Sequence, residues 1–364
     1  MEYLPEPIGK KFTAILMKWH SQRNKREMPW KGERDPYKIW LSEVILQQTR
    51  VAQGWQYYTS FIKQYPTIRH LARAKDQEVF KLWEGLGYYN RCKNLLFTAR
   101  QIVKEHKGIF PDEYEAILAL KGVGPYTAAA IASFAYNLPY AVVDGNVFRV
   151  LSRFFGIAAA IDSTKGKSLF TVLAGEVLSK KEPGSYNQAI MDFGAVVCKP
   201  FSPVCSSCPL QKNCVAFREG QVNQLPVREK ILQRKHRWLN YFLFEHDQTI
   251  LVHQRTGKDI WQNLFEFYLL ESEEPVFWDE KTVKGWLKEQ IGIQKANVLY
   301  ISKPSVQQLT HQQIKGQFIC VQLKTVPAFL KKYQWQPVNS LRKLPFPKII
   351  TQHLETSVAP KNLF

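Results

Sequence analysis

Four cysteines between residues 198 and 214 constrain this 364-residue sequence more than any other feature, with the spacing Cys198-x6-Cys205-x2-Cys208-x5-Cys214. In a reducing compartment, where disulfides are rare, such a cluster predicts a metal centre. A short loop with four thiolates suits one 4Fe-4S iron–sulfur cluster. The alternative, a four-cysteine zinc site, more often has two Cys-x2-Cys pairs separated by a longer loop. We therefore expect a loop over 198–214 folded around one 4Fe-4S cluster with a structural role.

The spacing of apolar residues predicts two domains of different class. Residues 1–217 have apolar residues at intervals of three and four, with few β-branched runs, which predicts a mostly α-helical region. Residues 218–237 are polar, basic and without periodicity, and are expected to be a linker. Strand-like runs and one helix over 281–290 then predict an α+β domain at 238–350, followed by a tail at 351–364.

The charge balance predicts a polyanionic partner. Lys and Arg number 50 against 31 Asp and Glu, which gives a formal net charge of +19. This excess favours nucleic acid over an anionic membrane surface. The longest small-apolar stretch, 128–135, is too short to span a bilayer, and residues 1–12 have no secretory apolar region. We expect a monomeric cytoplasmic protein of bacterial type, associated with the nucleoid and not with a membrane.

Residues 118–132, LALKGVGPYTAAAIA, predict two helices joined by a glycine turn. The first helix should end near Leu120, and the second should begin near Pro125, a residue suited to the first helical position. The turn should leave the backbone N–H groups of Gly122 to Gly124 without hydrogen-bond partners at a helix N-terminus, an arrangement that suits a phosphate. The alternative is a packing corner with no ligand, but the full pattern is that of the DNA-binding helix-hairpin-helix. The candidate DNA contacts of this hairpin are Lys121, Gly122, Val123 and Gly124.

Two carboxylates suggest glycosidic chemistry. Glu43 lies one helical turn from both Ile39 and Leu46, so it falls on an apolar helix stripe where its pKa should be raised. The alternative is a glutamate that reaches solvent or pairs with an arginine. Asp144 precedes a helix expected over 147–155, where it is either an ordinary N-cap or a functional anion. Cleavage of a base–sugar bond needs a proton for the leaving base and a negative charge beside the sugar cation. One protonated and one ionised carboxyl group supply both.

The sequence resembles the adenine-specific DNA glycosylase (MutY) family of the helix-hairpin-helix/Gly-Pro-Asp superfamily. The resemblance covers nearly the whole chain and is densest from Pro29 to Cys214. It implies a helical glycosylase region with a 4Fe-4S loop and a Nudix-like C-terminal domain. The motifs that carry it, besides the cysteines, are Met28-Pro29-Trp30, Glu43 to Thr49, Glu84 to Arg91, Leu120 to Ala128 and Val143 to Val147.

The resemblance also implies an activity and a set of site residues. Members of the family remove adenine mispaired with 8-oxoguanine or guanine in double-stranded DNA. By resemblance, Glu43 protonates adenine at N7 and Asp144 stabilises the sugar cation. Tyr126 and Asn146 would position these two groups. Contacts to the extruded base or to the DNA are implied for Arg26, Trp30, Lys31, Gln48, Thr49, Leu86 and Tyr88.

Tyr126 separates two related activities. In the superfamily's glycosylase/lyase members, such as the endonuclease III type, a lysine at this position forms a Schiff base with the sugar. A phenol cannot form that imine, so we expect base removal without efficient strand cleavage. The alternative is an endonuclease III-like glycosylase/lyase that acts on oxidised pyrimidines.

The C-terminal domain departs from the family pattern in two ways. Residues 284–290 lack the paired glutamates of Nudix hydrolases, which argues against a nucleotide pyrophosphohydrolase. The lesion-recognition loop of the family usually reads Phe-Ser-His, whereas this chain has Leu309-Thr310-His311. A further alternative, a DNA-binding protein without catalysis, is disfavoured because Glu43 and Asp144 are both present.

Overall fold

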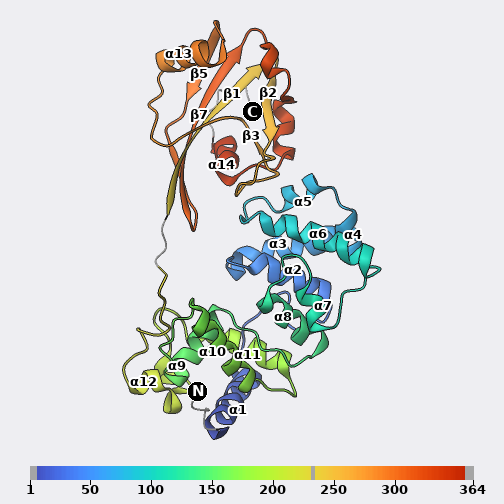
Figure 1. Cartoon of the computed structure of the whole chain (residues 1–364), viewed down its shortest axis with the longest axis vertical. Helices are drawn as coiled ribbons and strands as arrows, with labels where there is room; N and C mark the ends of the chain where they lie inside the picture. Colours follow the sequence, from blue (N-terminus) through green and yellow to red (C-terminus); the bar gives the residue numbers. More distant parts are fainter. Residues whose placement is uncertain (1–5, 231–233, 357–364) are drawn as a thin grey trace. The chain divides into compact units, whose positions relative to one another are not determined.

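The computed structural model describes residues 6–230 and 234–356, and its contacts divide the chain into two compact units. The helical unit comprises residues 1–73 and 93–231, and the sheet unit comprises 74–92 and 232–364 (Figure 1). No helix within the described ranges is both long enough and apolar enough to cross a membrane.

The helical unit is built from helices joined by short turns, as the three- and four-residue spacing of apolar residues predicts. Two 3-10 turns, Cys205–Ser207 and Gln211–Asn213, lie in the cysteine loop. The helices are α1 Glu6–Arg23, α2 Pro36–Leu46, α3 Val51–Gln64, α4 Ile68–Arg73, α6 Asn90–Glu105 (its first residues belong to the sheet unit), α7 Tyr114–Leu118, α8 Pro125–Tyr136, α9 Gly145–Phe155, α10 Thr164–Glu176, α11 Pro183–Val196 and α12 Val215–Arg218.

The core of this unit lies where α1, α8, α9, α10 and α11 meet. Phe12 of α1 packs on Phe154 of α9 with ring centroids 4.7 Å apart. Trp19 of α1 meets Phe193 of α11 edge to face, with centroids 4.9 Å apart. Small alanines on α8 are fully buried and let neighbouring helices approach closely. The helix α2 packs on α8 and is buried almost all round, as expected for a helix within the interior.

Two helix starts place functional side chains. Asp35 caps α2 by accepting from the Tyr37 N–H, and Pro36 occupies the first helical position. Asp144 caps α9 in the same way, by accepting from the Val147 N–H. The N-cap interpretation of Asp144 is therefore correct, and it does not exclude a functional one.

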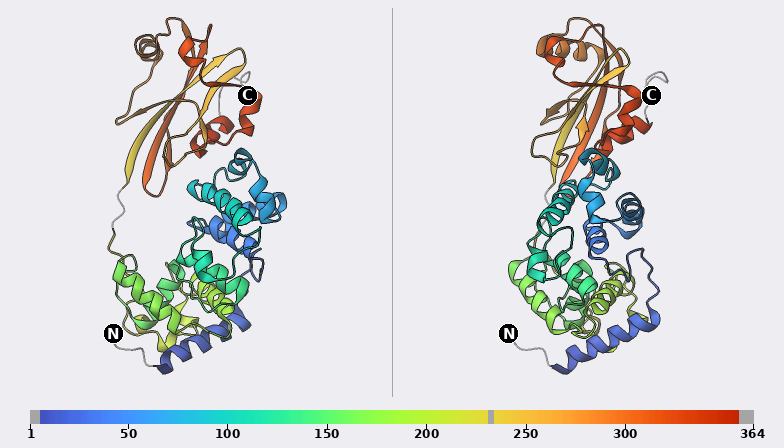
Figure 2. Two further views of the ribbon diagram at one scale, coloured as in Figure 1. Left: turned by 45° about the vertical axis from the view of Figure 1, so that its right-hand side comes forward. Right: turned by 90° about the vertical axis from the view of Figure 1, so that its right-hand side faces the viewer.

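The sheet unit contains an eight-stranded mixed sheet with the strand order β3-β2-β1-β7-β5 along its main path. The long strands β1 and β7 run parallel, paired from Lys235 with Gln312 to Glu245 with Gln322 (Figures 1 and 2). The strands are β1 Lys235–His246, β2 Thr249–Gln254, β3 Phe265–Glu266, β4 Tyr268–Ser272, β5 Ala296–Ile301, β6 Ser305–Gln308, β7 Gln312–Leu323 and β8 Gln334–Pro337.

Helices cover parts of this sheet. The helix α13, Glu280–Ile291, starts with a capping box between Asp279 and Thr282, and its buried face joins the core formed by Phe242 and Phe244. The other helices of the unit are α5 Asp76–Leu82, α14 Lys348–Thr356 and the 3-10 turns Ala328–Leu330 and Val338–Lys343. The α+β class and the helix expected over 281–290 are thus confirmed.

Two boundaries differ from the sequence-based expectation. The strand β1 begins at Lys235, inside the segment expected to be linker, because its first residues pair with β7. The helix α14 continues to Thr356, into the segment expected to be a tail. Part of the expected linker, 231–233, and residues 357–364 lie outside the described residues.

Candidate active site

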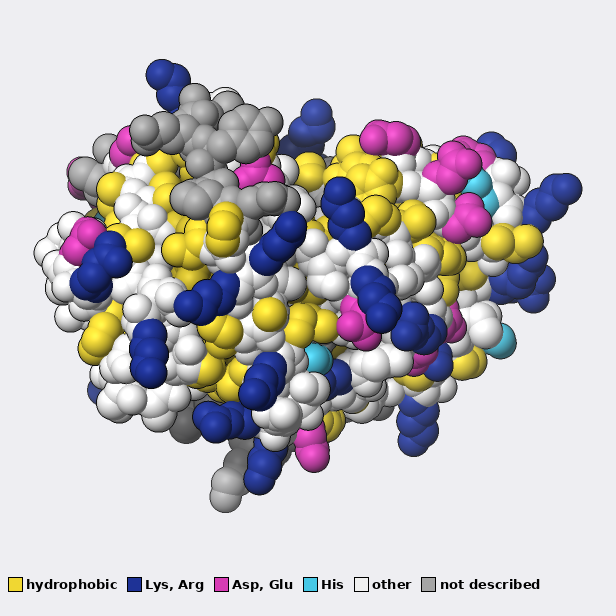
Figure 3. Space-filling view, turned by 90° about the horizontal axis from the view of Figure 1, so that it is seen from below, with side chains coloured by type: hydrophobic (Ala, Val, Ile, Leu, Met, Phe, Trp, Pro, Cys, Tyr) yellow, Lys and Arg dark blue, Asp and Glu magenta, His cyan; other side chains and the backbone are white. Residues whose placement is uncertain are grey.

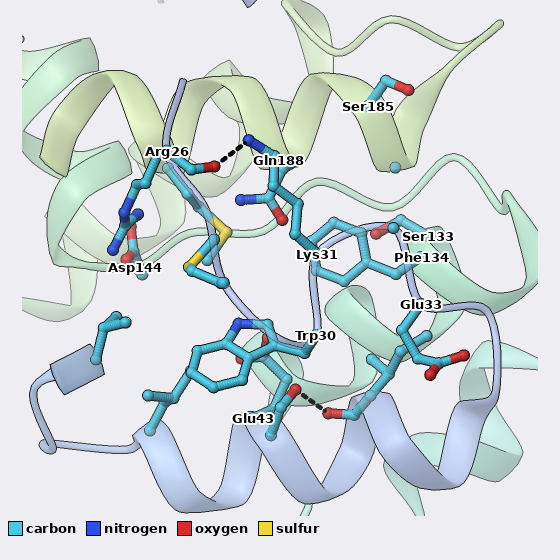
Figure 4. A pocket seen from close by; sticks show the side chains of 18 of the residues that line it. Arg26, Trp30, Lys31, Glu33, Glu43, Ser133, Phe134, Asp144, Ser185 and Gln188 are labelled. Carbon is cyan, nitrogen blue, oxygen red and sulfur yellow. Dashed lines mark hydrogen bonds between the residues drawn. The ribbon is translucent and has the colours of Figure 1, made fainter. Parts of the chain in front are cut away.

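A cavity of about 360 Å³ lies in the helical unit, enclosed by the loop before α2 and by α2, α8, α9 and α11 (Figure 4). The cavity brings together all four residues expected to act in catalysis and four of those expected to contact base or DNA. These eight lining residues are Glu43, Tyr126, Asp144, Asn146, Arg26, Trp30, Lys31 and Thr49.

Glu43 is the buried acid of this cavity. It lies on α2, and only 5% of its surface is exposed. Its pKa is raised from the usual 4.5 to about 7: burial is the main cause, a hydrogen bond with Tyr126 opposes the shift, and the negative charge of Asp144 adds to it. At neutral pH Glu43 therefore exists in both forms, and the protonated form can act as a general acid.

Asp144 has a different environment from Glu43. Its Oδ1 accepts from the Val147 N–H at 2.8 Å, and its Oδ2 accepts from the Asn146 amide at 2.7 Å. Burial raises the pKa of Asp144, but these hydrogen bonds and the charge of Arg149 lower it. Burial outweighs them, so the pKa of Asp144 is raised overall. The two N–H donors are nevertheless an environment that stabilises a carboxylate, whereas the described groups that shift the pKa of Glu43 include no such pair.

Tyr126 interacts with both carboxyl groups, with Glu43 through a hydrogen bond and with Asp144 through its charge. Burial and the neighbouring charges of Glu43 and Asp144 raise its pKa well above 10, so the phenol stays protonated. Its hydroxyl is hydrogen-bonded to Glu43. Asn146 is fixed in turn, because its Oδ1 accepts from Arg149 at 2.8 Å while its amide donates to Asp144.

Aromatic packing forms one wall of the cavity. Trp30 is 8% exposed and packs edge to face on Tyr58, with ring centroids 5.3 Å apart. Gln48, expected to contact DNA, does not line the cavity. It is exposed at the end of α2, with φ at 58°, a left-handed backbone conformation that is uncommon outside glycine and asparagine.

The hairpin over 118–132 has the expected form. The helix α8 begins at Pro125 with Gly124 as its N-cap, and Gly122 has φ at 78°. One expectation was wrong: the Val123 N–H is not bare, because it donates to the Leu120 carbonyl at 3.1 Å and closes the turn. The N–H groups that can face a phosphate are therefore those of Gly122 and Gly124.

We expect Gly122→Ala to lower the free energy of unfolding by about 1–3 kcal/mol, because alanine is strained at positive φ. A Cβ at this position would also lie 2.7 Å from Asn94 Cβ. Urea unfolding measures the loss, and duplex binding should weaken with it. Gly124→Ala is the matched control, because Gly124 has φ at −98° and no atom within 4 Å of the added Cβ. Equal effects of the two substitutions would contradict this description of the turn.

The four cysteines of the loop line one small apolar hollow together with Arg153. The Arg153 guanidinium lies 3.5 Å from Cys198 Sγ, and Cys214 Sγ lies 3.4 Å from the Arg153 carbonyl. Across the described residues, no three His, Cys, Asp or Glu side chains form a group that could hold a metal ion. A 4Fe-4S cluster is bound at its corners, one thiolate to each iron, so its ligands surround it rather than converge on one ion.

The remaining expected DNA contacts lie in the sheet unit. Leu309, Thr310 and His311 form the turn between β6 and β7, and the Tyr88 and Thr310 hydroxyls are hydrogen-bonded. Tyr88 is 38% exposed and also has a positive φ of 49°. Leu86, in contrast, is only 6% exposed, so it is a packing residue in this structure.

Several cavity residues were not found by sequence reasoning. The helix α11 contributes Gln188 and Met191 to the lining, and α1 contributes His20. Asp192, also on α11, is fully buried and hydrogen-bonded to Arg26 of the cavity wall. The sequence signal that could have identified Asp192 was an acidic residue within the apolar run Ile190-Met191-Asp192-Phe193.

The positive charge of the chain is not confined to one place. On the face shown in Figure 3, Lys and Arg side chains are spread among hydrophobic and neutral groups. The hairpin and the cavity therefore locate the candidate DNA contacts better than the net charge does.

Comparison with known proteins identifies the family. The model of the HhH-GPD superfamily base excision DNA repair protein matches residues 41–173, and the NUDIX domain model matches 240–356. An adenine DNA glycosylase of Buchnera aphidicola subsp. Acyrthosiphon pisum is 34% identical over 281 residues, which cover 77% of this chain and 78% of the relative. The chain belongs to the adenine DNA glycosylase family.

Other adenine DNA glycosylases extend this match. One from Buchnera aphidicola subsp. Schizaphis graminum is 29% identical, and the alignment covers 94% of this chain and 98% of the relative's length. One from Mus musculus is 42% identical over 60% of this chain and 45% of its own. The resemblance seen in the sequence is therefore confirmed, and the chain is a DNA N-glycosylase of base excision repair with a Nudix-like C-terminal domain.

Solved structures agree with this fold. A thermostable thymine-DNA glycosylase has a TM-score of 0.54 and 29% identity, covering 58% of this chain and 97% of its own. An endonuclease III bound to DNA has a TM-score of 0.52 at 21% identity, covering 60% and 99%, and this likeness concerns the fold alone.

Proposed function

We propose that this adenine DNA glycosylase family member hydrolyses the N-glycosidic bond of adenine mispaired with 8-oxoguanine or guanine in double-stranded DNA, without efficient strand cleavage. The observation that carries the proposal is one cavity that holds both Glu43, with a pKa of about 7, and the multiply hydrogen-bonded carboxylate of Asp144. An acid and an anion with different environments are what an oxocarbenium-like transition state needs.

The reaction follows from these two groups. An extruded adenine enters the cavity, at a cost of a few kcal/mol of lost stacking. Glu43 gives its proton to N7 of adenine, so that the base leaves as a neutral molecule while the C1′–N9 bond breaks. Asp144 stabilises the positive charge left on the sugar, and water then adds to C1′ and releases a proton. Tyr126 and Asn146 hold the two carboxyl groups in place through the hydrogen bonds described above.

The four loop cysteines are the residues that would hold a 4Fe-4S cluster. Their thiols line one hollow. The short loop with a single Cys-x2-Cys pair suits a cluster better than a zinc ion. The cluster would cross-link the loop over 198–214. Arg153 donates to the Lys199 carbonyl at 2.8 Å and to the Leu225 carbonyl at 3.0 Å, and so supports the start of this loop and the chain that follows it.

Recognition of the opposite base is assigned to the sheet unit. Thr310 supplies a hydroxyl where the family pattern has serine, and it is already hydrogen-bonded to Tyr88. Leu309 replaces the aromatic residue of the pattern, so stacking on the opposite base is reduced. We therefore expect excision opposite both 8-oxoguanine and guanine, with a smaller difference between the two than the family pattern would give.

A single-turnover assay tests the function. Three duplexes are compared, with adenine opposite 8-oxoguanine, adenine opposite guanine, and thymine glycol opposite adenine. Release of adenine from the first two, with the thymine-glycol duplex intact, supports the proposal. Preferred release of thymine glycol would support the endonuclease III-like alternative.

We expect borohydride to trap no covalent adduct between the wild-type chain and an adenine-mispair duplex, because Tyr126 cannot form an imine with the sugar. Gel electrophoresis after reduction measures the adduct. Tyr126→Lys is the positive control, because it supplies an amine inside the cavity that Tyr126 lines. A stoichiometric adduct with the wild-type chain would show lyase chemistry and refute this part of the proposal.

A further inference from the structure

A third carboxylate lies behind the cavity wall. Asp192 of α11 is 0% exposed, yet it is surrounded by cationic and amide donors rather than by solvent. Its Oδ1 accepts from Arg26 Nη1 at 2.7 Å. Its Oδ2 accepts from the Asn24 amide at 2.8 Å and lies 3.4 Å from Lys31 Nζ.

These contacts fasten the loop over 24–31 to α11. Lys31 Nζ donates to the Arg26 carbonyl at 2.6 Å, and Asn24 Oδ1 accepts from the Arg26 N–H at 3.1 Å. The loop has no helical or strand hydrogen bonds of its own over this stretch. Besides these local contacts and a turn closed by the Lys31 N–H on the Met28 carbonyl, one buried anion connects the loop to α11, and removal of that anion would leave two cations without their partner.

Arg26 is the residue through which Asp192 can act on the reaction. Both Arg26 and Lys31 line the cavity that contains Glu43. The pairing with Asp192 uses only Nη1 of Arg26, and no further partner of the guanidinium is found among the residues that the structure describes. A planar guanidinium held at one nitrogen keeps its remaining N–H donors in a fixed direction. Such donors match the acceptor nitrogens on the edge of a purine.

The charges around Glu43 give Asp192 a second effect. Tyr126 and Asp144 act directly on Glu43. Arg26 and Lys31 line the same cavity. His20 lies near Lys31 and Asp192. Two uncompensated cations that line the same cavity would favour the ionised form of Glu43, which cannot donate a proton. Asp192 opposes that effect because it pairs with both cations.

We propose that Asp192 is a positioning residue for base excision: it directs the Arg26 guanidinium at the edge of the extruded purine and neutralises the cavity cations so that Glu43 keeps its proton. The inference rests on the proposed function, since it assigns a residue to the recognition step of that same cavity.

The test compares single-turnover rates of adenine release for the wild-type chain and Asp192→Asn, per active site, across a range of pH. We expect the rate near neutral pH to fall by about tenfold to a hundredfold, and the loss of activity with rising pH to begin at lower pH than in the wild type. Glu182→Gln is the matched control, because Glu182 is an exposed acid at the start of the same helix. It should behave as the wild type does.

Arg26→Lys supplies a second test that does not depend on folding of the Asp192 variant. It keeps the charge and the ion pair but loses the planar fork, so we expect a comparable loss of rate. In the double variant, Asp192→Asn should then add little to the loss of rate at low pH caused by Arg26→Lys, since both changes remove the same oriented donor, but it should still shift the pH dependence, since Arg26→Lys keeps the cation that Asp192 pairs with.

Three results would overturn the inference. One is a wild-type rate in Arg26→Lys, which would show that the oriented fork is not needed. Another is an Asp192→Asn variant whose rate per active site and pH dependence both match the wild type, which would make Asp192 a structural residue only. The third is a wild-type chain that releases no adenine, in which case the proposed function fails and the inference fails with it. If the inference alone is wrong, the wild-type chain still releases adenine, so the two failures are distinguishable.

Discussion

Asp144→Asn should slow adenine release by about a thousandfold or more, while binding of a mispair duplex stays within a few fold of the wild type. The amide keeps the size of the side chain and can still accept from the Val147 N–H, which donates to Asp144 Oδ1 at 2.8 Å. The negative charge that would stabilise the sugar cation is lost. Single-turnover kinetics and a gel-shift titration measure the two quantities separately.

The control for Asp144→Asn is Asp112→Asn, which removes the charge of an exposed acid in the same unit. It should leave both the rate and the affinity unchanged. Comparable activity in Asp144→Asn and the wild-type chain would contradict the assigned role and would favour an N-cap function alone. Loss of duplex binding together with activity would point to a folding defect instead.

Glu43→Gln should lower the excision rate by about 10²- to 10⁴-fold, the range expected when a general acid is removed. The pH dependence of the wild-type rate follows from the same group. Because Glu43 acts in its protonated form and has a pKa of about 7, the rate should be full below that pH and fall about tenfold per unit well above it. At low pH the rate should also fall, as Asp144 becomes protonated.

The same substitution should stabilise the fold at high pH. Below pH 4.5 Glu43 is protonated in both the folded and unfolded chain, so its ionisation costs nothing. Between pH 4.5 and about 7 the unfolded chain ionises first, and folding becomes less favourable as the pH rises. Above that pKa the cost is constant at about 3 kcal/mol. Urea unfolding of Glu43→Gln should therefore show this gain near pH 8 and none near pH 4, and a gain at both would refute the raised pKa.

The sequence predicted the local setting of the two carboxyl groups to which we assign the chemistry. Glu43 stood out because a carboxylate on an apolar helix stripe has to be buried, and the structure shows it 5% exposed. Asp144 stood out through its position before a helix, and its carboxylate does cap α9. Burial and capping depend only on local periodicity, which a single sequence contains, whereas the roles of the two residues were implied by the family resemblance and stay predictions.

The sequence could not show how distant segments share one cavity. Asp192 is 166 residues from its partner Arg26, so no local spacing reveals their contact. The expectation of an unpaired N–H at Val123 was wrong, because this N–H donates to the Leu120 carbonyl and closes the turn. The glycine pattern alone does not predict which N–H closes it. Tertiary pairing likewise extends β1 back to Lys235, in a stretch whose composition resembles a linker.

The most direct test of the account is single-turnover release of the base from two duplexes that differ in one atom of the purine ring. One duplex carries adenine opposite 8-oxoguanine, and the other carries 7-deazaadenine, which has no N7 to accept the proton of Glu43. We expect equal duplex affinity, rapid release of adenine and no measurable release of 7-deazaadenine. Release of both bases at similar rates would contradict it.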